Sequence, residues 1–207
     1  KVTGKAKYAG DIVPAGALHA RILRPPAHGA SLSGIDTSAA ETVPGVRVVR
    51  DGDLVAVLHA HRDEADRALS LIKAVVTPSP STLDDRSIFD HLVKTAPAAQ
   101  AVDQGGVLAD GERIAAQVFE RTYLNSYVAH APMETHSAVA AVENGKVTVW
   151  AGTQTPFPLK SQVAQALTLA PDKVRIITPY VGGGFGGKSA SRQAVEAARL
   201  ATITGQP

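Results

Sequence analysis

A run of glycines near the end of the chain is the feature that most constrains its fold. Residues 182–187 hold five glycines around Phe185, and Lys188 follows them. Because each glycine costs backbone entropy in a regular element, the run predicts a loop with positive φ angles or a close approach of another group. A strand pattern precedes the loop and a helix pattern follows it, so its N–H groups could converge on an anionic group. A flexible surface turn is the plainer alternative.

Residues 182–189 also match G-x-x-x-x-G-K-[ST], the pattern of loops that cradle nucleotide phosphates. Pro179 and Tyr180 argue against this interpretation, because they interrupt the apolar strand that normally runs into the first glycine. Such loops also usually open their domain, whereas this one lies near the end of the sequence. A nucleotide-binding protein is therefore an alternative interpretation of the loop.

Composition excludes several other classes of protein. The 207 residues carry 21 Lys and Arg against 19 Asp and Glu, and the basic residues are scattered, so nucleic-acid binding is not expected. No apolar run approaches about 18 residues, so no membrane span is expected. The sequence contains no cysteine, which leaves no ligands here for a cysteine-bound iron–sulfur cluster. A redox centre would therefore be a bound cofactor, or would lie on a partner.

Periodicity predicts an α+β fold with two domains joined by an arm. The first domain, residues 1–77, is expected to form strands at 18–24, 46–49 and 54–58, a short helix at 36–41 and an amphipathic helix at 62–75. Residues 78–112 are rich in Ala, Pro and Gln, with a Gly pair at 105–106, and predict a linker with one short helix at 88–93. The second domain, residues 113–207, is expected to form strands at 114–124, 138–142, 146–151 and 174–178, and helices from Pro156 and at 191–202.

Several motifs occur in a fixed order along the chain. Residues 130–136 precede the pair Thr153 and Gln154, and the glycine loop follows about 30 residues later. In that order they resemble the start of the molybdenum-binding domain and the two cofactor-contacting loops of the molybdenum hydroxylases, the xanthine dehydrogenase and aldehyde oxidoreductase family. Upstream segments resemble landmarks of the family's α/β-hammerhead domain, namely residues 3–12, 18–21, 35–38 and 43–46. The short connection between the strands at 46–49 and 54–58 resembles the isoquinoline oxidoreductase and nicotinate dehydrogenase branch.

The resemblance implies an α/β-hammerhead domain followed by the first part of the molybdopterin-binding domain. It implies hydroxylation of an aldehyde or N-heteroaromatic substrate, with water as the oxygen source. The implied cofactor is molybdopterin with molybdenum, with the cytosine dinucleotide form as one option. The implied partners are the remainder of the large subunit, a small subunit with two [2Fe–2S] clusters and, in some members, a cytochrome c. The compartment is left open between the bacterial cytoplasm and the periplasmic face of the inner membrane.

The resemblance also implies roles for individual residues. Gln154 would hydrogen-bond a molybdenum oxygen, and the N–H groups of Phe185 and Gly186 would reach other molybdenum or pterin oxygens without ligating the metal directly. The other implied cofactor-binding positions are Gly183, Gly184 and Gly187. On the alternative interpretation, Gln154 is a polar residue at a strand end and Phe185 is a core aromatic that anchors the loop.

Other polar residues near these motifs have more than one interpretation. Lys188 either balances a phosphate or carboxylate charge or is an exposed lysine at a helix start. His130, Glu134 and His136 lack the H-E-x-x-H spacing of a zinc site and are expected to line a domain interface or funnel. Three large aromatic residues are expected to serve in packing: Tyr123, Trp150 and Tyr180.

Ser189 stands where many xanthine dehydrogenases have a glutamate that touches the purine, so a purine substrate is not expected. The family's general base is a glutamate near the far C-terminus, and no such motif occurs here. The sequence is therefore expected to be a fragment cut at both ends, inactive alone and without a catalytic residue of its own. A non-catalytic assembly fragment is a further alternative.

Overall fold

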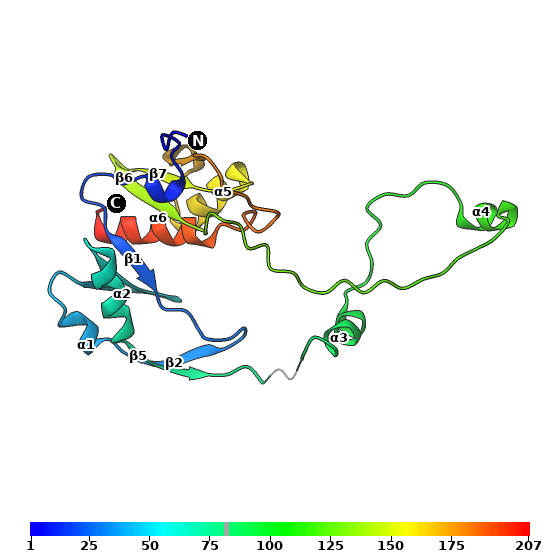
Figure 1. The fold of residues 1–207 in the computed structure, drawn as a ribbon, viewed down its shortest axis with the longest axis horizontal. Helices are drawn as coiled ribbons and strands as arrows, with labels where there is room; N and C mark the ends of the chain where they lie inside the picture. The colour runs from blue at the N-terminus through cyan, green and yellow to red at the C-terminus, as the bar shows by residue number, and fades with distance from the viewer. Residues whose placement is uncertain (81–82) are drawn as a thin grey trace. The chain divides into compact units, whose positions relative to one another are not determined.

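The computed structural model describes residues 1–80 and 83–207, which divide into two compact units. One unit comprises Lys1–Ser79 together with His130–Pro207, and the other comprises Pro80–Ala129. The first unit contains both helices and strands (Figure 1), which confirms the mixed α and β content that periodicity predicts. The domain boundaries after residues 77 and 112 stay a prediction.

The first unit holds most of the regular structure. Its amino-terminal part contains η1 (Ala9–Asp11), β1 (His19–Ile22), β2 (Ser31–Asp36), α1 (Ser38–Glu41), β3 (Arg47–Asp51), β4 (Leu54–His59), α2 (Arg62–Ser70) and β5 (Lys73–Thr77). Its carboxy-terminal part contains β6 (Ala138–Glu143), β7 (Lys146–Ala151), α5 (Pro156–Ala166), η2 (Pro171–Lys173), β8 (Val174–Ile177) and α6 (Arg192–Thr204).

Strand β4 is the centre of an antiparallel sheet of order β1-β4-β3. All of its residues are buried, which explains its nearly continuous apolar sequence. Ala56 and Leu58 pack with Leu200 of α6, whereas Val57 packs on the opposite face with small residues of α1 and α2. The sheet is therefore covered on both faces by helices, and its strands lie close to where periodicity predicts them.

Strands β2 and β5 form a separate antiparallel pair with a register shift between Leu32 and Gly34. This pair corrects the sequence analysis, which predicts one helix over residues 62–75 and no strand at 31–36. Helix α2 ends at Ser70, and β5 follows it. The apolar spacing continues the helical period past Ser70, but the β-branched residues from Val75 onward favour a strand once β2 offers a partner edge.

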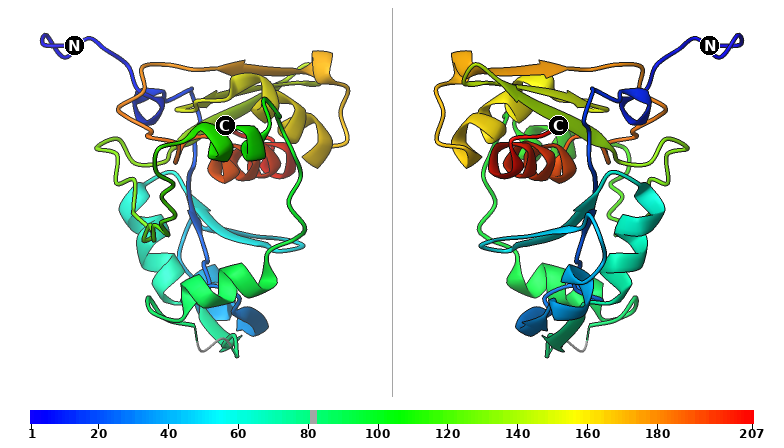
Figure 2. Two further views of the ribbon diagram at one scale, coloured as in Figure 1. Left: turned by 90° about the vertical axis from the view of Figure 1, so that its right-hand side faces the viewer. Right: turned by 90° about the vertical axis from the view of Figure 1, so that its left-hand side faces the viewer.

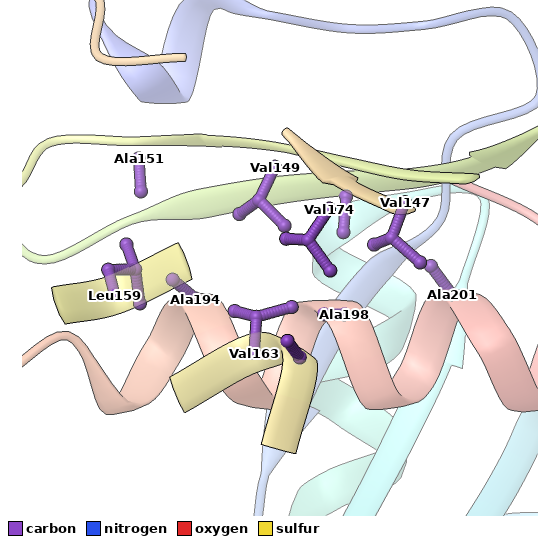
Figure 3. Close-up of a cluster of buried hydrophobic side chains, with 11 residues drawn as sticks. Val147, Val149, Ala151, Leu159, Val163, Val174, Ala194, Ala198 and Ala201 are labelled. Atoms are coloured by element: carbon purple, nitrogen blue, oxygen red, sulfur yellow. The ribbon is translucent and has the colours of Figure 1, made fainter. Parts of the chain in front are cut away.

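The second three-stranded sheet has the order β6-β7-β8. Strands β6 and β7 form the predicted hairpin, whose turn residues Asn144 and Gly145 both have positive φ, as a tight hairpin turn requires. Strand β8 then pairs in parallel with β7 after the crossover through α5. Figure 3 shows the core under this sheet, where alternate β7 side chains meet α5 and α6. Its labelled residues are Val147, Val149, Ala151, Leu159, Val163, Val174, Ala194, Ala198 and Ala201.

Helix α6 lies between the two three-stranded sheets (Figure 2). Its alanines face the β6-β7-β8 sheet, where small side chains let helix and sheet approach closely, and Leu200 faces the other sheet. Ion pairs reinforce the second contact: Arg199 bonds Asp51 at 2.8 Å, and buried Glu196 bonds Arg24. The helix therefore joins the two parts of the first unit.

The unit Pro80–Ala129 contains the helices α3 (Ile88–Thr95) and α4 (Leu108–Ile114). Helix α3 confirms the short helix predicted near residues 88–93, whereas the strand predicted at 114–124 is wrong, because α4 ends at Ile114 and an extended segment follows. An apolar segment becomes a strand only beside a partner edge, and within the described residues this one pairs with none. No residue of this unit is buried in its described part. Across residues 1–80 and 83–207, no helix is both long and apolar enough to cross a bilayer.

Candidate cofactor-binding loop

The glycine-rich segment forms a loop between β8 and α6, as the sequence predicts. Its φ angles are positive at Gly183 (92°), Phe185 (54°) and Gly186 (96°). Phe185 is therefore held in a conformation that costs free energy for a residue with a side chain, and such strain is commonly found at functional sites. The surrounding contacts must hold the loop in this shape.

Gln154 supplies the first of these contacts from the turn between β7 and α5. Its Oε1 atom accepts the N–H groups of Gly186 at 3.0 Å and Lys188 at 3.3 Å. A Cβ atom on Gly184 would overlap Oε1, so this glycine leaves the space that the amide occupies. Because two donors meet Oε1, the amide is oriented with Nε2 on the other side, where it makes no hydrogen bond to a described residue.

The residues beside Gln154 bind the carboxy-terminal end of the loop. The Lys188 carbonyl accepts the Gln154 N–H at 3.0 Å and the Thr153 hydroxyl at 3.3 Å. The Thr155 hydroxyl donates to the carbonyl of Ser189 at 2.9 Å. These three bonds fix the β7–α5 turn against the loop along consecutive residues.

Glu134 and Lys188 form an ion pair beneath the loop. Lys188 has 0% exposure, and its Nζ atom lies 2.5 Å from Glu134 Oε2. The same oxygen accepts the Gly182 N–H at 2.8 Å. Burial by itself raises the pKa of Glu134, but the Lys188 ammonium and the Gly182 N–H outweigh it and hold that pKa below its usual value. Glu134 is therefore a carboxylate in the folded chain.

Two histidines from the same segment contact the loop from another side. His136 Nε2 lies 3.0 Å from the Gly187 carbonyl oxygen, and a Cβ atom on Gly187 would stand 3.2 Å from the His130 side chain. In the described residues, no group of three or more His, Asp or Glu is arranged to hold a metal ion. The histidines and Glu134 therefore support the loop.

Some backbone N–H groups of the loop have hydrogen-bond partners in the described part of the chain, and others do not. The Gly187 N–H bonds the Gly184 carbonyl at 2.8 Å, which closes the turn. Within the described residues, no acceptor faces the N–H groups of Gly183, Gly184 and Phe185. The Phe185 N–H is thus free to bond a cofactor oxygen, as the resemblance implies. The Gly186 N–H is not, because it already bonds Gln154. The loop presents a short run of free donors beside Gln154 Nε2.

Several interpretations of single residues need correction. Phe185 is 73% exposed, so it is not a core aromatic, and Lys188 is buried, so it is not an exposed lysine at a helix start. Tyr123 is exposed and does not serve in packing. Tyr180 is half-exposed, yet its ring lies 6.2 Å from that of Tyr8 in a tilted arrangement, and its N–H bonds the Lys7 carbonyl.

Sequence reasoning missed the Glu134–Lys188 pair and the amino-terminal strand contact at Tyr8. Two glycines carry the signal for the pair. A Cβ atom at Gly152 would stand 3.1 Å from Glu134 Oε2, and one at Gly182 would overlap Glu134 Cβ. Glycines leave space for a side chain that comes from elsewhere in the chain, but the sequence does not say which one.

The buried ion pair also bears on the nucleotide-binding alternative. In a phosphate-cradling P-loop the lysine reaches the nucleotide phosphates. Here the Lys188 ammonium points to Glu134 and has no exposed surface. The loop therefore matches the P-loop pattern in sequence, but its lysine is buried against Glu134 and does not face a phosphate site.

A family model described as the molybdopterin cofactor-binding domain matches residues 93–207. The chain belongs to this family. It is 31% identical over its whole length to a nicotinate dehydrogenase subunit of Pseudomonas putida, of which it spans 18%. It is 30% identical over its whole length to the beta subunit of isoquinoline 1-oxidoreductase of Brevundimonas diminuta, of which it spans 28%. The chain thus covers less than a third of the length of these two relatives, both of which are subunits of oxidoreductases.

The fold is also found in a solved structure. Quinoline 2-oxidoreductase from Pseudomonas putida 86 matches 99% of the chain with a TM-score of 0.76 at 24% identity, and the match spans 32% of that protein's chain. These findings confirm the resemblance to the large subunits of molybdenum hydroxylases. Neither the nucleotide-binding protein nor the non-catalytic assembly fragment is supported by them.

Proposed function

We propose that Gln154 and the loop 183–187 bind oxygen atoms of a molybdopterin cofactor. The observation that carries the proposal is a set of unpaired donors: the N–H groups of Gly183, Gly184 and Phe185 on the strained loop, and Nε2 of Gln154, whose Oε1 atom is bonded to the same loop. Neutral amide donors suit electron-rich oxygens, because they stabilise negative charge without introducing a full positive charge. The donor set therefore fits the oxygen-rich cofactor that the family binds.

Gln154 and the loop residues have different proposed roles. Gln154 Nε2 and the Phe185 N–H donate to the cofactor, and Gly183 and Gly184 let it approach the backbone. The Gly186 N–H holds the Gln154 carbonyl, which differs from the direct cofactor contact that the resemblance implies. Gly187 closes the turn through its bond to Gly184.

The whole protein is proposed to hydroxylate an aldehyde or N-heteroaromatic substrate with water as the oxygen source. The names of the relatives support this class of reaction, since they include nicotinate and isoquinoline oxidoreductases. When bound, the cofactor supplies two-electron redox chemistry, and the electrons leave to iron–sulfur clusters on a partner. The residues of this chain bind and orient, and the general base lies outside them.

Finer features of the proposal follow the resemblance. Residues 1–77 form the α/β-hammerhead domain, residues 78–112 are the linker, and residues 113–207 are the first part of the cofactor-binding domain. The cofactor is the molybdopterin form with or without cytosine dinucleotide, and the absence of cysteine leaves the iron–sulfur clusters to another chain. The partners are the rest of the large subunit, a small subunit with two [2Fe–2S] clusters and, as in some members of the family, a cytochrome c.

Metal and pterin analysis of the assembled enzyme tests the proposal. The wild-type assembly should contain molybdenum and pterin, and Gln154→Glu should lose most of both, because a carboxylate replaces the amide donor with an acceptor. Gln165→Glu is the matched control on the exposed surface of α5, and it should keep the wild-type content. A wild-type assembly free of molybdenum would overturn the proposal.

A further inference from the structure

The ion pair between Glu134 and Lys188 has no part in the donor set of the loop, yet it is the most deeply buried charged contact beside it. Removing two charges from water costs several kcal/mol per ion, so a buried pair is a poor way to gain stability. In some proteins a buried polar or charged group is retained because it selects one conformation among several. The surroundings of this pair indicate what it selects.

A single carboxylate oxygen connects both ends of the loop. Glu134 Oε2 accepts the N–H of Gly182, the first residue of the loop, and the ammonium of Lys188, the last. This oxygen therefore ties the two ends of the loop to each other, in addition to the backbone bond from the Glu134 N–H to the Gly182 carbonyl. Of the five residues between these ends, all but Phe185 are glycines, so the backbone between them has few constraints of its own.

The backbone of Lys188 transmits this position to Gln154. The Lys188 N–H donates to Gln154 Oε1 at 3.3 Å, and the Lys188 carbonyl accepts the Gln154 N–H at 3.0 Å. Loss of the side-chain anchor would leave the Lys188 backbone held by Gln154 and the Thr153 hydroxyl, so we expect both bonds to Gln154 to shift. The direction in which Gln154 Nε2 points thus depends on an ion pair that lies beneath the loop.

The chain also keeps space for the carboxylate. Gly152 comes from the end of β7 and Gly182 from the loop, and a Cβ atom on either would crowd Glu134. Glu134 Oε1 is buried and makes no hydrogen bond of ordinary geometry to a described residue, although the backbone N–H of Ala9 lies near enough to the carboxylate to help lower its pKa. The space left by the two glycines and the two bonds to Oε2 together hold the carboxylate in one place.

We propose that Glu134 and Lys188 are positioning residues that set the orientation of Gln154 Nε2 and of the free N–H groups toward the cofactor. The inference rests on the proposed function of the loop. With the pair intact, the donors keep one arrangement before the cofactor arrives. Without it, the loop takes other backbone conformations and its affinity for the cofactor falls.

The test uses the assembled enzyme with two variants. Lys188→Met keeps the length of the side chain but leaves Glu134 as an unpaired buried charge, so it is expected to lower stability as well. Glu134→Gln combined with Lys188→Met leaves no unpaired charge, which should restore the thermal midpoint while the loop ends stay untied. Molybdenum retained per subunit after gel filtration should fall at least about tenfold in both, as for other groups that orient metal contacts.

A spectroscopic measurement separates positioning from stability. The electron paramagnetic resonance signal of the residual molybdenum should differ from wild type in the double variant. Glu196→Gln is the control, because this buried carboxylate pairs with Arg24 and Arg192 on α6 and has no bond to the loop. It should lower the thermal midpoint and leave both the molybdenum content and the signal unchanged.

The outcomes distinguish the two proposals. A wild-type assembly without molybdenum would overturn the proposed function of the loop. If wild type contains molybdenum and the double variant retains as much, with the same signal, the ion pair only stabilises the fold and the inference fails. An equal loss of molybdenum in Glu196→Gln would also overturn it.

Discussion

The loop 182–188 and the unit Pro80–Ala129 are both irregular in sequence, yet their structures differ in kind. In the loop, Gly184 leaves space that Gln154 occupies, and Lys188 is fully buried. In the other unit, a Cβ atom on Gly105 would meet nothing within 4 Å, and the described residues include none that is buried. Both segments contain glycines, but only in the loop do residues from distant parts of the sequence pack against them and form a site.

The largest difference should appear when a lysine is removed from each segment. Lys188→Met leaves Glu134 buried without its partner and should destabilise the 207-residue chain by about 3–5 kcal/mol. Lys94→Met on exposed helix α3 should change stability by less than about 0.5 kcal/mol. Urea unfolding followed by circular dichroism measures both, and equal effects would remove the distinction between the segments.

A matched pair of glycine substitutions should give the next largest effect. Gly184→Ala places a methyl group on Gln154 Oε1, which must give up its bonds to Gly186 and Lys188 at a cost of about 1–3 kcal/mol. Gly105→Ala has open space and should be neutral, or stabilise slightly through the unfolded chain. The same urea titration applies, and a neutral Gly184→Ala would show that the Gln154 bonds contribute little.

A smaller effect should appear as a dependence on pH. Because the pKa of Glu134 is lowered in the folded chain, its charge stabilises the fold above its usual value of 4.5. This contribution is lost as the pH falls through the lowered pKa. The stability advantage of wild type over Glu134→Gln should therefore shrink between about pH 7 and about pH 3. For Glu112→Gln on exposed helix α4, the unfolding free energy should change with pH as it does for wild type. If wild type were more stable than Glu134→Gln by the same amount at both pH values, the lowered pKa of Glu134 would be wrong.

The smallest effect is expected in the extended segment after α4. Phe119 is 69% exposed, so Phe119→Ser should alter the unfolding free energy of the chain by less than about 0.5 kcal/mol. Leu159→Ala in the core of the β6-β7-β8 sheet is the reference for a buried apolar residue and should cost about 2–5 kcal/mol. A large loss from Phe119→Ser would mean that this segment packs in solution.

Local patterns predicted the elements whose partners lie nearby in sequence. The β6–β7 hairpin and the helix that starts at Pro156 follow from turn residues and periodicity within a few positions. Strand β5 is not predicted because its partner β2 lies about 40 residues upstream and contains a bulge between Leu32 and Gly34. Its own residues continue a helical period, so only the distant edge decides between helix and strand.

The candidate site shows the same division. The glycine run predicted a loop with positive φ, and the order of motifs pointed to Gln154 as its companion, 32 residues before Gly186. The burial of Lys188 could not be read locally, because its counter-charge Glu134 is 54 residues away. A lysine beside flexible glycines resembles a surface residue until that partner is known.

Helix α6 comes later in the sequence than all the strands that it covers. The β1-β4-β3 sheet lacks Leu200, and the β6-β7-β8 sheet lacks its alanine face, until this helix has been synthesised. During translation neither sheet can therefore complete its core when its own strands leave the ribosome. Both should close together once α6 has left the ribosome, so that the two parts of this unit fold in a single step.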